Sequence, residues 1–478
     1  MNLDSRQAEA KLKIPKYGPN SIELKRSLGL FDATMIIVGN IIGIGIFTTT
    51  GLVADALPNP KMILFVWILG GLLTLCGALT YAELGAMLPM AGGEYVYLRE
   101  AYGPFWAFLS GWTYFFVTNP GSIAAMSLGA CAYLKPFWPS LLGHRLVELP
   151  ILGFHWTLTT DQLAAVGIVL VFSTINYLGV KQGSRAQNLL TIAKLASILA
   201  ICGLGLVVGK GDWGHFSSPA SAESNVWQGN FSLAMIAVFF AYTGWFASTY
   251  VASEIHRPER NIPYSVIGGT LIVIAIYFLM NVAYLFAVSV NDLRGVINVG
   301  EMATTALFGQ QAAKFLSIVI LISILGAVNS VILTAPRIYY AMARDGMFFR
   351  KAAEIHPTFR TPSTSIILQA IWTCLLAISG SFSQLLTYTV VAMICFSIMT
   401  GAAIFKLRVS RPDLPRPYKT FGFPWVPAIF VLSYCLILGN IAFSQVREAI
   451  VGLAIVSLGA PVYFYWRRAT TNYQGVRQ

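Results

Sequence analysis

A glycine-rich segment within a long apolar stretch carries the groups best suited to hold a small charged molecule. It reads Gly-Asn-Ile-Ile-Gly-Ile-Gly-Ile-Phe at residues 39–47. Each glycine lowers helix stability by about 1 kcal/mol relative to alanine, and unpaired amides are costly in the interior of a membrane. We therefore expect a helix that is interrupted here so that its bare peptide groups can bind a ligand.

A second irregular segment, Phe-Phe-Ala-Tyr-Thr-Gly-Trp-Phe at residues 239–246, lies in the middle of another uncharged stretch. For the first segment alone, the spacing of Gly39 and Gly43 is equally typical of close packing between two membrane helices. A matching irregularity in the second half of the chain favours a pair of discontinuous helices, as in transporters built from inverted repeats.

An interrupted helix offers N–H groups at the start of one half and carbonyl groups at the end of the other. A carboxylate suits the N–H groups near Gly43, Ile44 and Gly45. An ammonium group suits the carbonyls near Ile41 and those of the second segment, at Phe240, Ala241 and Thr243. The sequence therefore predicts a site for a zwitterion, read by backbone atoms that every α-amino acid can engage.

Lys194 stands alone in an apolar helical stretch. A cation within a membrane costs roughly 2.5–3.5 kcal/mol even on lenient scales and marks a functional position by default. The alternative is a side chain that extends to the nearby cytoplasmic interface. If Lys194 is functional, it is either a permanent cation or a titrating group that carries a proton.

Three glutamates near predicted helix ends form a second set of candidates. Glu83 and Glu94 flank the inner end of the second predicted span, and Glu254 follows the second irregular segment. They are expected either to form cytoplasmic ion pairs with Arg337 or Arg344 that hold an inner gate, or to be ordinary charges at helix ends.

Two further polar residues lie beside apolar stretches. Asp32 begins the first span, where we expect an N-terminal cap or a member of the inner gate. Asn329 is a polar group in the eighth span that needs a partner. It either lines the pocket or joins two helices.

Composition identifies the elements that must position these residues. Of the 478 residues, 56% are hydrophobic and 11% charged, and the mean hydropathy is +0.67. A soluble domain has roughly 25% charged residues. Long uncharged runs, such as residues 104–134 and 262–290, exceed the length of about 18 residues typical of a membrane helix. They exclude a water-soluble enzyme and an outer-membrane barrel.

We predict twelve spans, centred near residues 40, 75, 119, 171, 198, 240, 276, 325, 372, 395, 435 and 457. With the N-terminus inside, 24 of the 32 Lys and Arg residues fall on the inner side and 7 on the outer side. Positive charge stays cytoplasmic during insertion, so both termini are expected in the cytoplasm. This membrane topology accounts for the net charge of +12, so we do not expect the protein to bind nucleic acid.

The chain resembles the amino acid–polyamine–organocation superfamily, and within it bacterial L-type amino acid transporters that include serine/threonine exchangers. The two irregular segments carry the resemblance, together with Pro-Glu-Arg-Asn-Ile-Pro at 258–263, Ala-Met-Ala-Arg-Asp-Gly at 341–346 and His-Pro-Thr-Phe-Arg-Thr-Pro at 356–362. These motifs cover nearly the whole chain in the order expected of the family.

The resemblance implies an all-α, LeuT-type fold with a 5+5 inverted repeat and twelve membrane helices. It divides the chain into a cytoplasmic tail at 1–30, a first repeat at 31–210, a second repeat at 226–408, helices 11 and 12 at 424–468, and a cytoplasmic tail at 469–478.

The resemblance also assigns roles to residues. It places the substrate carboxylate on the amides of Gly43, Ile44 and Gly45, the ammonium on carbonyls that include those of Ile41 and Thr243, and an outer lid at Phe240. Lys194 would replace the sodium ion of sodium-coupled relatives. The chain departs from the family pattern at two positions that bear on which substrate side chain it prefers. Ile44 stands where close relatives often have serine, and Thr243 stands where many have glycine.

The expected function is sodium-independent transport of small or mid-sized neutral L-amino acids across the inner membrane by alternating access, either as an exchanger or coupled to protons. The alternatives are a cationic amino acid or polyamine transporter and, from another class, a non-transporting amino acid sensor. No catalytic or nucleotide-binding motif is present, and we expect no cofactor or metal. Eukaryotic L-type transporters join a heavy chain through an outer-loop cysteine, which residues 135–160 lack, so no such partner is expected.

Overall fold

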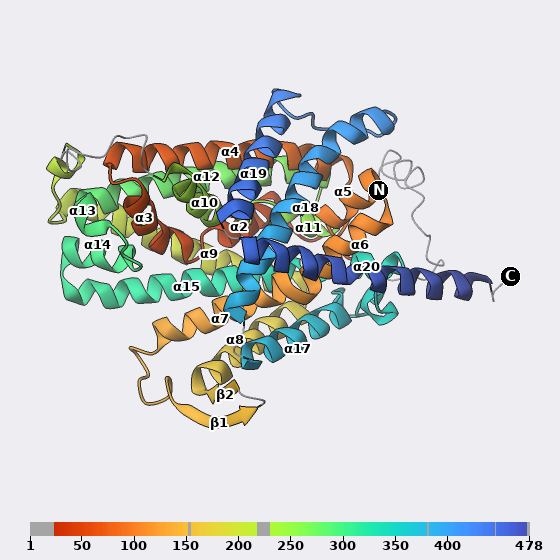
Figure 1. The fold of residues 1–478 in the computed structure, drawn as a ribbon, viewed down its shortest axis with the longest axis horizontal. Coiled ribbons are helices and arrows are strands. Elements are labelled where there is room, and N and C mark those ends of the chain that lie inside the picture. The colour runs from red at the N-terminus through yellow and green to blue at the C-terminus, as the bar shows by residue number, and fades with distance from the viewer. Residues whose placement is uncertain (1–22, 152–153, 218–229, 380–381, 445, 476–478) are drawn as a thin grey trace.

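The computed structural model describes residues 23–151, 154–217, 230–379, 382–444 and 446–475, and this part of the chain is largely helical (Figure 1). Seven of its helices are long and apolar enough to cross a membrane. They are Pro60–Met87, Val180–Val208, Pro258–Ala287, Gln310–Arg344, Val390–Ser410, Trp425–Phe443 and Ile450–Arg467. The bent pair α2 (Leu30–Ile41) and α3 (Gly45–Ala56) forms an eighth span when counted as one.

Each of the twelve predicted span centres falls within a helix. The long spans above correspond to α4 (Pro60–Met87), α9 (Val180–Val208), α12 (Pro258–Ala287), α15 (Gln310–Thr334) with α16 (Pro336–Arg344), α18 (Phe382–Ser410), α19 (Trp425–Ser444) and α20 (Val446–Gly475). The other centres fall in α2, α7 (Asn119–Leu134), α8 (Thr160–Tyr177), α10 (Phe231–Ala241) and α17 (Ser363–Ser379). The all-α membrane architecture is confirmed, whereas the count of twelve spans stays a prediction.

Shorter elements connect these helices. They are α5 (Glu94–Tyr102), α6 (Pro104–Thr113), η1 (Tyr114–Thr118), η2 (Trp213–Phe216), α11 (Ala247–Tyr250), η3 (Ala252–Glu254), α13 (Val290–Leu293), α14 (Val299–Phe308) and η4 (Arg350–Ala353). Helix α20 continues to Gly475, past the predicted boundary at residue 468 between the last membrane helix and the tail. The extension Thr-Thr-Asn-Tyr-Gln is polar, which indicates that the helix runs on beyond its apolar part.

A two-stranded hairpin is an exception to the all-helical prediction. Strands β1 (Arg145–Ile151) and β2 (Phe154–Thr159) pair antiparallel within the predicted outer loop at 135–160. They lie at the lower left of Figure 1, beyond the ends of α7 and α8. The predicted spans leave this segment as a connection between two helices, and its β-branched and aromatic residues favour strands.

Helix α9 buries polar side chains and exposes apolar ones, which is the reverse of a helix on the surface of a soluble protein. Its buried positions include the polar residues Gln187, Thr191 and Lys194, whereas Leu189, Leu204 and others on its outer face are exposed. An apolar exterior suits lipid, and buried polar groups require internal partners. Helix α9 packs against α2, α12 and α15, which places its polar face toward the interior of the bundle.

The third predicted span contains a π-helical turn, η1, between α6 and α7. Pro120 follows it and cannot donate a backbone hydrogen bond. Trp372 Nε1 of α17 donates to the carbonyl of Phe116 at 2.8 Å, and the Tyr339 hydroxyl of α16 donates to that of Tyr114 at 3.2 Å. The backbone groups loosened by the turn therefore find side-chain partners, and π-turns of this kind are frequent at functional sites.

Candidate functional site

The first predicted interruption is present. Helix α2 ends at Ile41, α3 begins at Gly45, and the two axes are bent by 43°. The Gly43 N–H donates to the Ile41 carbonyl at 2.9 Å, which closes a tight turn. Within the described residues, the N–H groups of Ile44 and Gly45 have no backbone acceptor. They are the bare amides that the sequence predicted for a carboxylate.

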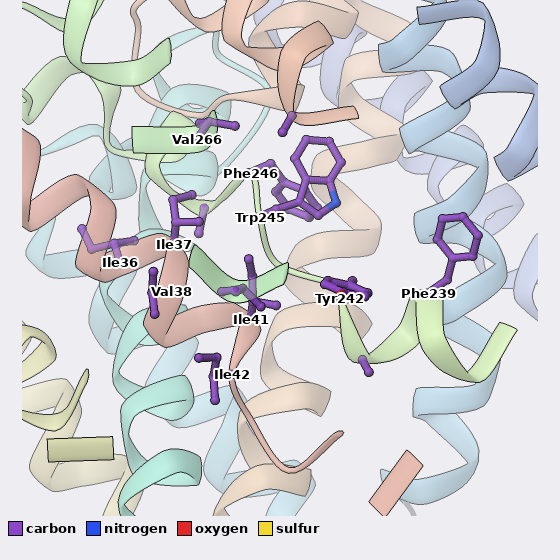
Figure 2. Packing of buried hydrophobic residues seen from close by; sticks show 14 of the residues in the cluster. Ile36, Ile37, Val38, Ile41, Ile42, Phe239, Tyr242, Trp245, Phe246 and Val266 are labelled. Atoms are coloured by element: carbon purple, nitrogen blue, oxygen red, sulfur yellow. The ribbon is translucent and has the colours of Figure 1, made fainter. Parts of the chain in front are cut away.

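The second predicted interruption is also present, because α10 ends at Ala241 and α11 begins at Ala247. Gly244 has a φ of +108°, and a Cβ there would lie 2.5 Å from Asn40 Nδ2. The Asn40 amide donates to the Gly244 carbonyl at 3.1 Å. This bond joins the two interruptions directly, and Figure 2 shows Ile41, at the end of α2, near Tyr242 and Trp245 of the second.

The two interruptions pack tightly at one point and leave room at another. A Cβ on Gly45 would lie 3.1 Å from Ala241 Cα, whereas a Cβ on Gly43 would meet only Ala327 Cβ, at 3.9 Å. Residues 43–45 and Thr243 are half-buried, and the Phe240 side chain is 58% exposed. Residues 43–45 and Thr243 are therefore partly accessible, whereas Ile41 and Ala241 are buried.

Tyr277 of α12 links the two interruptions, and sequence reasoning missed it. Its hydroxyl lies 2.9 Å from the Ile41 carbonyl and 2.9 Å from the Ala241 carbonyl. Its ring is fully buried against Trp67 and Tyr242, with centroids 5.3 and 4.9 Å away. A hydroxyl carries one proton, so it satisfies one of these carbonyls fully at any moment. A tyrosine within a long apolar helix was the available signal.

The other predicted ammonium ligands differ in their surroundings. The Phe240 carbonyl accepts from the Thr243 N–H at 3.1 Å, and the Thr243 hydroxyl donates to the Phe239 carbonyl at 3.2 Å. The Thr243 carbonyl accepts no hydrogen bond from another described residue. Thr243 therefore directs its hydroxyl to its own helix and leaves its carbonyl open.

Lys194 reaches the first interruption. It is fully buried, and its ammonium donates to the carbonyls of Gly39 at 3.1 Å, Ile42 at 2.6 Å and Ser323 at 3.0 Å. Three carbonyls match the three N–H groups of an ammonium, so this geometry suits the charged side chain. Extension toward the cytoplasmic interface, the alternative role, does not occur.

Asn329 is fully buried and engaged by neighbouring helices. Its amide donates to the Gly183 carbonyl at 3.1 Å and to Gln187 Oε1 at 2.9 Å, and its carbonyl accepts from Asn176 at 2.9 Å. These partners belong to α8 and α9. The geometry favours the helix-joining role over contact with the interruptions.

Glu254 and Arg337 form the predicted ion pair. Both side chains are fully buried, and the guanidinium donates to the carboxylate at 2.7 and 3.0 Å. The pair joins η3, which follows the second interruption, to α16. Beside it, the N–H groups of Ser27 and Leu28 donate to the Glu254 carbonyl at 2.8 and 2.9 Å. These contacts join the start of α2 to the segment that follows the second interruption.

Asp32 also lies at the start of α2. One carboxylate oxygen accepts from the Gly29 N–H at 2.8 Å and caps α2. The other accepts from Ser184 at 2.9 Å and Asn188 at 2.7 Å on α9. The cap expected of Asp32 from the sequence is present, and its contacts with Ser184 and Asn188 join the start of α2 to α9. Membership of an inner gate stays a prediction.

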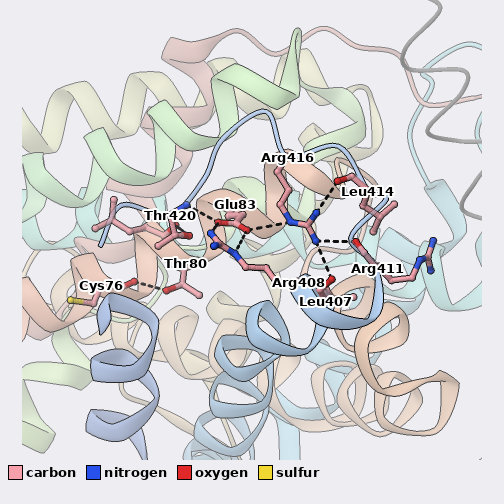
Figure 3. A network of polar contacts seen from close by, with 10 residues as sticks. Cys76, Thr80, Glu83, Leu407, Arg408, Arg411, Leu414, Arg416 and Thr420 are labelled. Carbon is pink, nitrogen blue, oxygen red and sulfur yellow. Dashed lines mark hydrogen bonds and ion pairs between the residues drawn. The ribbon is translucent and has the colours of Figure 1, made fainter. Parts of the chain in front are cut away.

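The predicted partners of Glu83 were wrong. Glu83 is fully buried and binds Arg408 of α18 at 3.0 and 2.7 Å (Figure 3). It also accepts from the Thr420 N–H at 2.6 Å and lies 3.7 Å from Arg416 Nε. The sequence pointed to Arg337 or Arg344, because it gave no sign that the segment after α18 folds back over the end of α4.

The predicted cationic partner of Glu94 was wrong as well. Its carboxylate accepts hydrogen bonds from the hydroxyls of Tyr81, Tyr114 and Tyr250, the last at 2.9 Å. These tyrosines come from α4, η1 and α11. Tyrosine–carboxylate clusters that combine three distant segments have no short sequence signature.

The described residues contain no group of three or more His, Cys, Asp or Glu side chains placed to hold a metal ion. The candidate site is instead built from backbone groups, hydroxyls and one ammonium. Such groups can bind and orient a zwitterion, and they offer no nucleophile with an activating base.

Known proteins share this chain's sequence over nearly its full length. The amino acid permease family matches residues 28–460. The serine/threonine exchanger SteT of Bacillus subtilis (strain 168) is 34% identical over 447 residues, which cover 92% of this chain and 97% of that protein.

Human relatives are nearly as similar. The large neutral amino acids transporter small subunit 2 is 31% identical over 462 residues, covering 94% of this chain and 82% of the relative. The b(0,+)-type amino acid transporter 1 is 31% identical over 471 residues, covering 96% and 91%. The predicted resemblance and the expectation of a transporter rather than an enzyme are confirmed. With two interrupted helices joined at their breaks and a match over nearly its entire length, the chain belongs to the amino acid permease family of membrane transporters.

Proposed function

We propose that this protein exchanges small or mid-sized neutral L-amino acids across the inner membrane by alternating access, without sodium. The observation that carries the proposal is the pair of interrupted helices, whose accessible break leaves the amides of Ile44 and Gly45 without backbone acceptors. The similarity to a serine/threonine exchanger supports the choice of cargo and of exchange.

In the proposed binding mode, backbone groups of the protein bind the carboxylate and the ammonium that all amino acids share. The substrate carboxylate accepts from the amides of Gly43, Ile44 and Gly45, and the positive end of α3 favours that charge. The ammonium is held by carbonyls of Ile41, Phe240, Ala241 and Thr243. To bind Ala241, it shares the carbonyl with the Tyr277 hydroxyl, which a carbonyl with two lone pairs permits. The Ile41 carbonyl accepts from both Tyr277 and the Gly43 N–H, so it becomes free for the ammonium when the Gly43 N–H turns to the substrate carboxylate.

Lys194 provides the permanent positive charge in this proposal. Its ammonium already fills the three-carbonyl site beside the first interruption. A sodium ion at this place would compete with the lysine for the same oxygens. Transport is therefore expected to proceed at the same rate in sodium and in choline media.

The gates are assigned by position. Phe240, the exposed aromatic residue at the second interruption, is the outer lid. Glu254 with Arg337 closes the inner end, and Glu83 with Arg408 holds α18 to the end of α4. Asn329 is retained as a neighbour of the site that fixes α15 rather than as a direct ligand.

The proposed setting is a multi-pass chain with both termini in the cytoplasm, as the distribution of basic residues indicates. The human relative is named a small subunit. Residues 135–160 of this chain contain no cysteine, so we infer that it acts without a disulfide-linked heavy chain.

Counterflow in liposomes tests the proposal. Purified protein is reconstituted with unlabelled serine inside and traces of labelled serine outside, and accumulation is followed with and without a pH gradient. Competition by threonine and leucine is expected, and independence from sodium. Competition by arginine or putrescine instead would support the cationic or polyamine alternative. Binding of serine without flux would identify a sensor and overturn the proposal.

A further inference from the structure

Glu94 is a fully buried carboxylate that the proposed transport mechanism does not use. It begins α5, between the second and third predicted spans. Three tyrosine hydroxyls donate to it, from Tyr81, Tyr114 and Tyr250. No arginine or lysine among the described residues forms an ion pair with it, in contrast to Glu83 and Glu254.

The three donors come from three elements that are far apart in the chain. Tyr250 lies on α11, which directly follows the second interruption, whereas Tyr114 lies on the π-turn η1 and Tyr81 on α4. The Gly92 N–H also donates to the Tyr250 carbonyl at 3.1 Å. An opening that moves α11 relative to these neighbours would separate or hydrate this cluster.

The surroundings of Glu94 offer other tyrosines but no available cation. Tyr97 of α5 and Tyr434 of α19 lie close enough to interact with it electrostatically. Helix α6 has no ionisable residue. Positive groups on the neighbouring elements are engaged elsewhere: Arg99 with Asp345, Arg337 with Glu254, Arg408 with Glu83, Arg344 with Tyr340, and Lys406 with the ring of Tyr102.

We propose that Glu94 is a proton-binding site that faces the cytoplasm and that its protonation holds the inner end of the transport pathway closed. The inference rests on the proposed function, since it assumes that the inner end opens during transport. The proton enters and leaves on the same side, so it regulates the cycle without being transported.

The direction of the effect follows from the environment of the carboxylate. Burial raises the pKa of Glu94 above its ordinary value, and the hydroxyls of Tyr114, Tyr81 and Tyr250 act in the opposite direction without cancelling the rise. Opening admits water, which hydrates the anion and lets the proton dissociate. The closed form thus binds the proton more tightly, and by linkage an acidic cytoplasm favours the closed form.

The test compares wild type with Glu94→Gln in proteoliposomes whose cytoplasmic side has a clamped pH. In wild type, serine exchange is expected to fall by about fivefold as this pH goes from about 8 to about 6, whereas Glu94→Gln changes by less than about 1.5-fold. An unchanged wild-type profile in Glu94→Gln overturns the inference.

Variants of the donors make the test independent of how Glu94→Gln folds. Tyr250→Phe and Tyr81→Phe each remove a donor to the anion, so each is expected to shift the midpoint of inhibition to higher pH. Tyr102→Phe is the matched control, because Tyr102 lies on the same helix as Glu94 and its hydroxyl donates to the Met399 carbonyl at 3.0 Å. A midpoint that stays in place in both donor variants, or shifts equally in Tyr102→Phe, contradicts the proposal.

A second readout separates this inference from the proposed function. A carboxyl whose pKa is raised by folding stabilises the fold at low pH, and the stabilisation is lost as the pH rises through the folded value. The melting temperature of wild type in detergent, relative to Glu94→Gln, is therefore expected to fall between about pH 5 and about pH 8. Parallel melting profiles overturn the proton site. Absence of serine exchange by wild type overturns only the proposed function.

Discussion

At the residue scale, Lys194 is the most sharply constrained side chain of the site. Lys194→Ala removes the donor from the carbonyls of Gly39, Ile42 and Ser323 at the first interruption. We expect serine exchange to fall by about tenfold or more, because a buried acceptor without its donor costs about 1–3 kcal/mol, and three are affected. Membrane insertion, checked by size-exclusion chromatography, should be retained.

Lys181→Ala is the matched control for this measurement. Lys181 lies on the same helix, α9, and is exposed, so its removal should leave exchange unchanged. Near-normal exchange by Lys194→Ala would exclude the lysine from the mechanism.

Mutation of the buried ion pair of Glu254 and Arg337 is expected to destabilise the protein more than mutation of an exposed ion pair. Removing one partner leaves an uncompensated buried charge, which costs about 3–5 kcal/mol. Arg337→Met should therefore lower the melting temperature in detergent markedly. Arg294→Met is the control, since Arg294 and Asp55 are 46% and 62% exposed, and an exposed pair contributes about 0–1 kcal/mol. Equal effects of the two substitutions would contradict the assigned closure.

Individual residues were predictable from the sequence where their type conflicts with their surroundings. Glycines within an apolar helix and a lysine within a membrane span can be recognised in the sequence. The structure brings Lys194 into contact with the glycine-rich first interruption. Partners were not predictable in this way. Glu83 meets Arg408, and Glu94 meets Tyr250, because the packing of distant helices decides these contacts and no local pattern encodes it.

At the scale of elements, the second interruption depends on a backbone conformation. Gly244 has a φ of +108°, and a Cβ there would collide with Asn40. Gly244→Ala is expected to reduce exchange by about tenfold or more, since it strains the turn and displaces the Asn40 bond. Gly203→Ala is the control, because it lies in helix α9 with no atom within 4 Å of the added Cβ.

The comparison of the two glycine variants is measured as exchange rate per folded protein. Gly203→Ala should keep full activity and gain up to about 1 kcal/mol of helix stability. Loss of activity in both variants would show that α9 and the interruption respond alike to an added methyl group, contrary to the expected difference.

Helix positions followed from the sequence better than helix ends did. Apolar length fixed where each span lies, because a bilayer requires about 20 apolar residues. It did not fix the end of α20, where the polar extension to Gly475 stays helical. The π-turn at Tyr114–Thr118 and the hairpin at 145–159 also escaped prediction, since both depend on contacts rather than on composition.

At the scale of the molecule, the two ends of the second interruption differ in exposure. Thr243 is half-buried beside the exposed Phe240, whereas Ser248 beyond the second interruption is fully buried. Thr243→Cys should therefore react with a membrane-impermeant thiol reagent added outside, and serine should slow the reaction. Ser248→Cys and the wild-type chain with its six cysteines are the controls. Faster labelling of Ser248→Cys from outside would reverse the assigned orientation.

The fold class was accessible from composition alone, because 56% hydrophobic and 11% charged residues leave a membrane bundle as the suitable architecture. The pairing of the two interruptions needed an argument about repeats, and the structure confirms both breaks. Their mutual contact through Asn40, Gly244 and Tyr277 was beyond the sequence, since it depends on how the two halves of the chain interlock.

The ammonium of Lys194 is covalently tethered, so the cation beside the first interruption cannot leave the protein during a transport cycle. Under the proposed exchange, one zwitterion enters for each that leaves, and no inorganic ion accompanies either. The cycle is then electrically silent. A potential imposed with potassium and valinomycin should leave the rate and the final distribution of serine unaltered, and the concentration ratios of the cargo alone should set its direction.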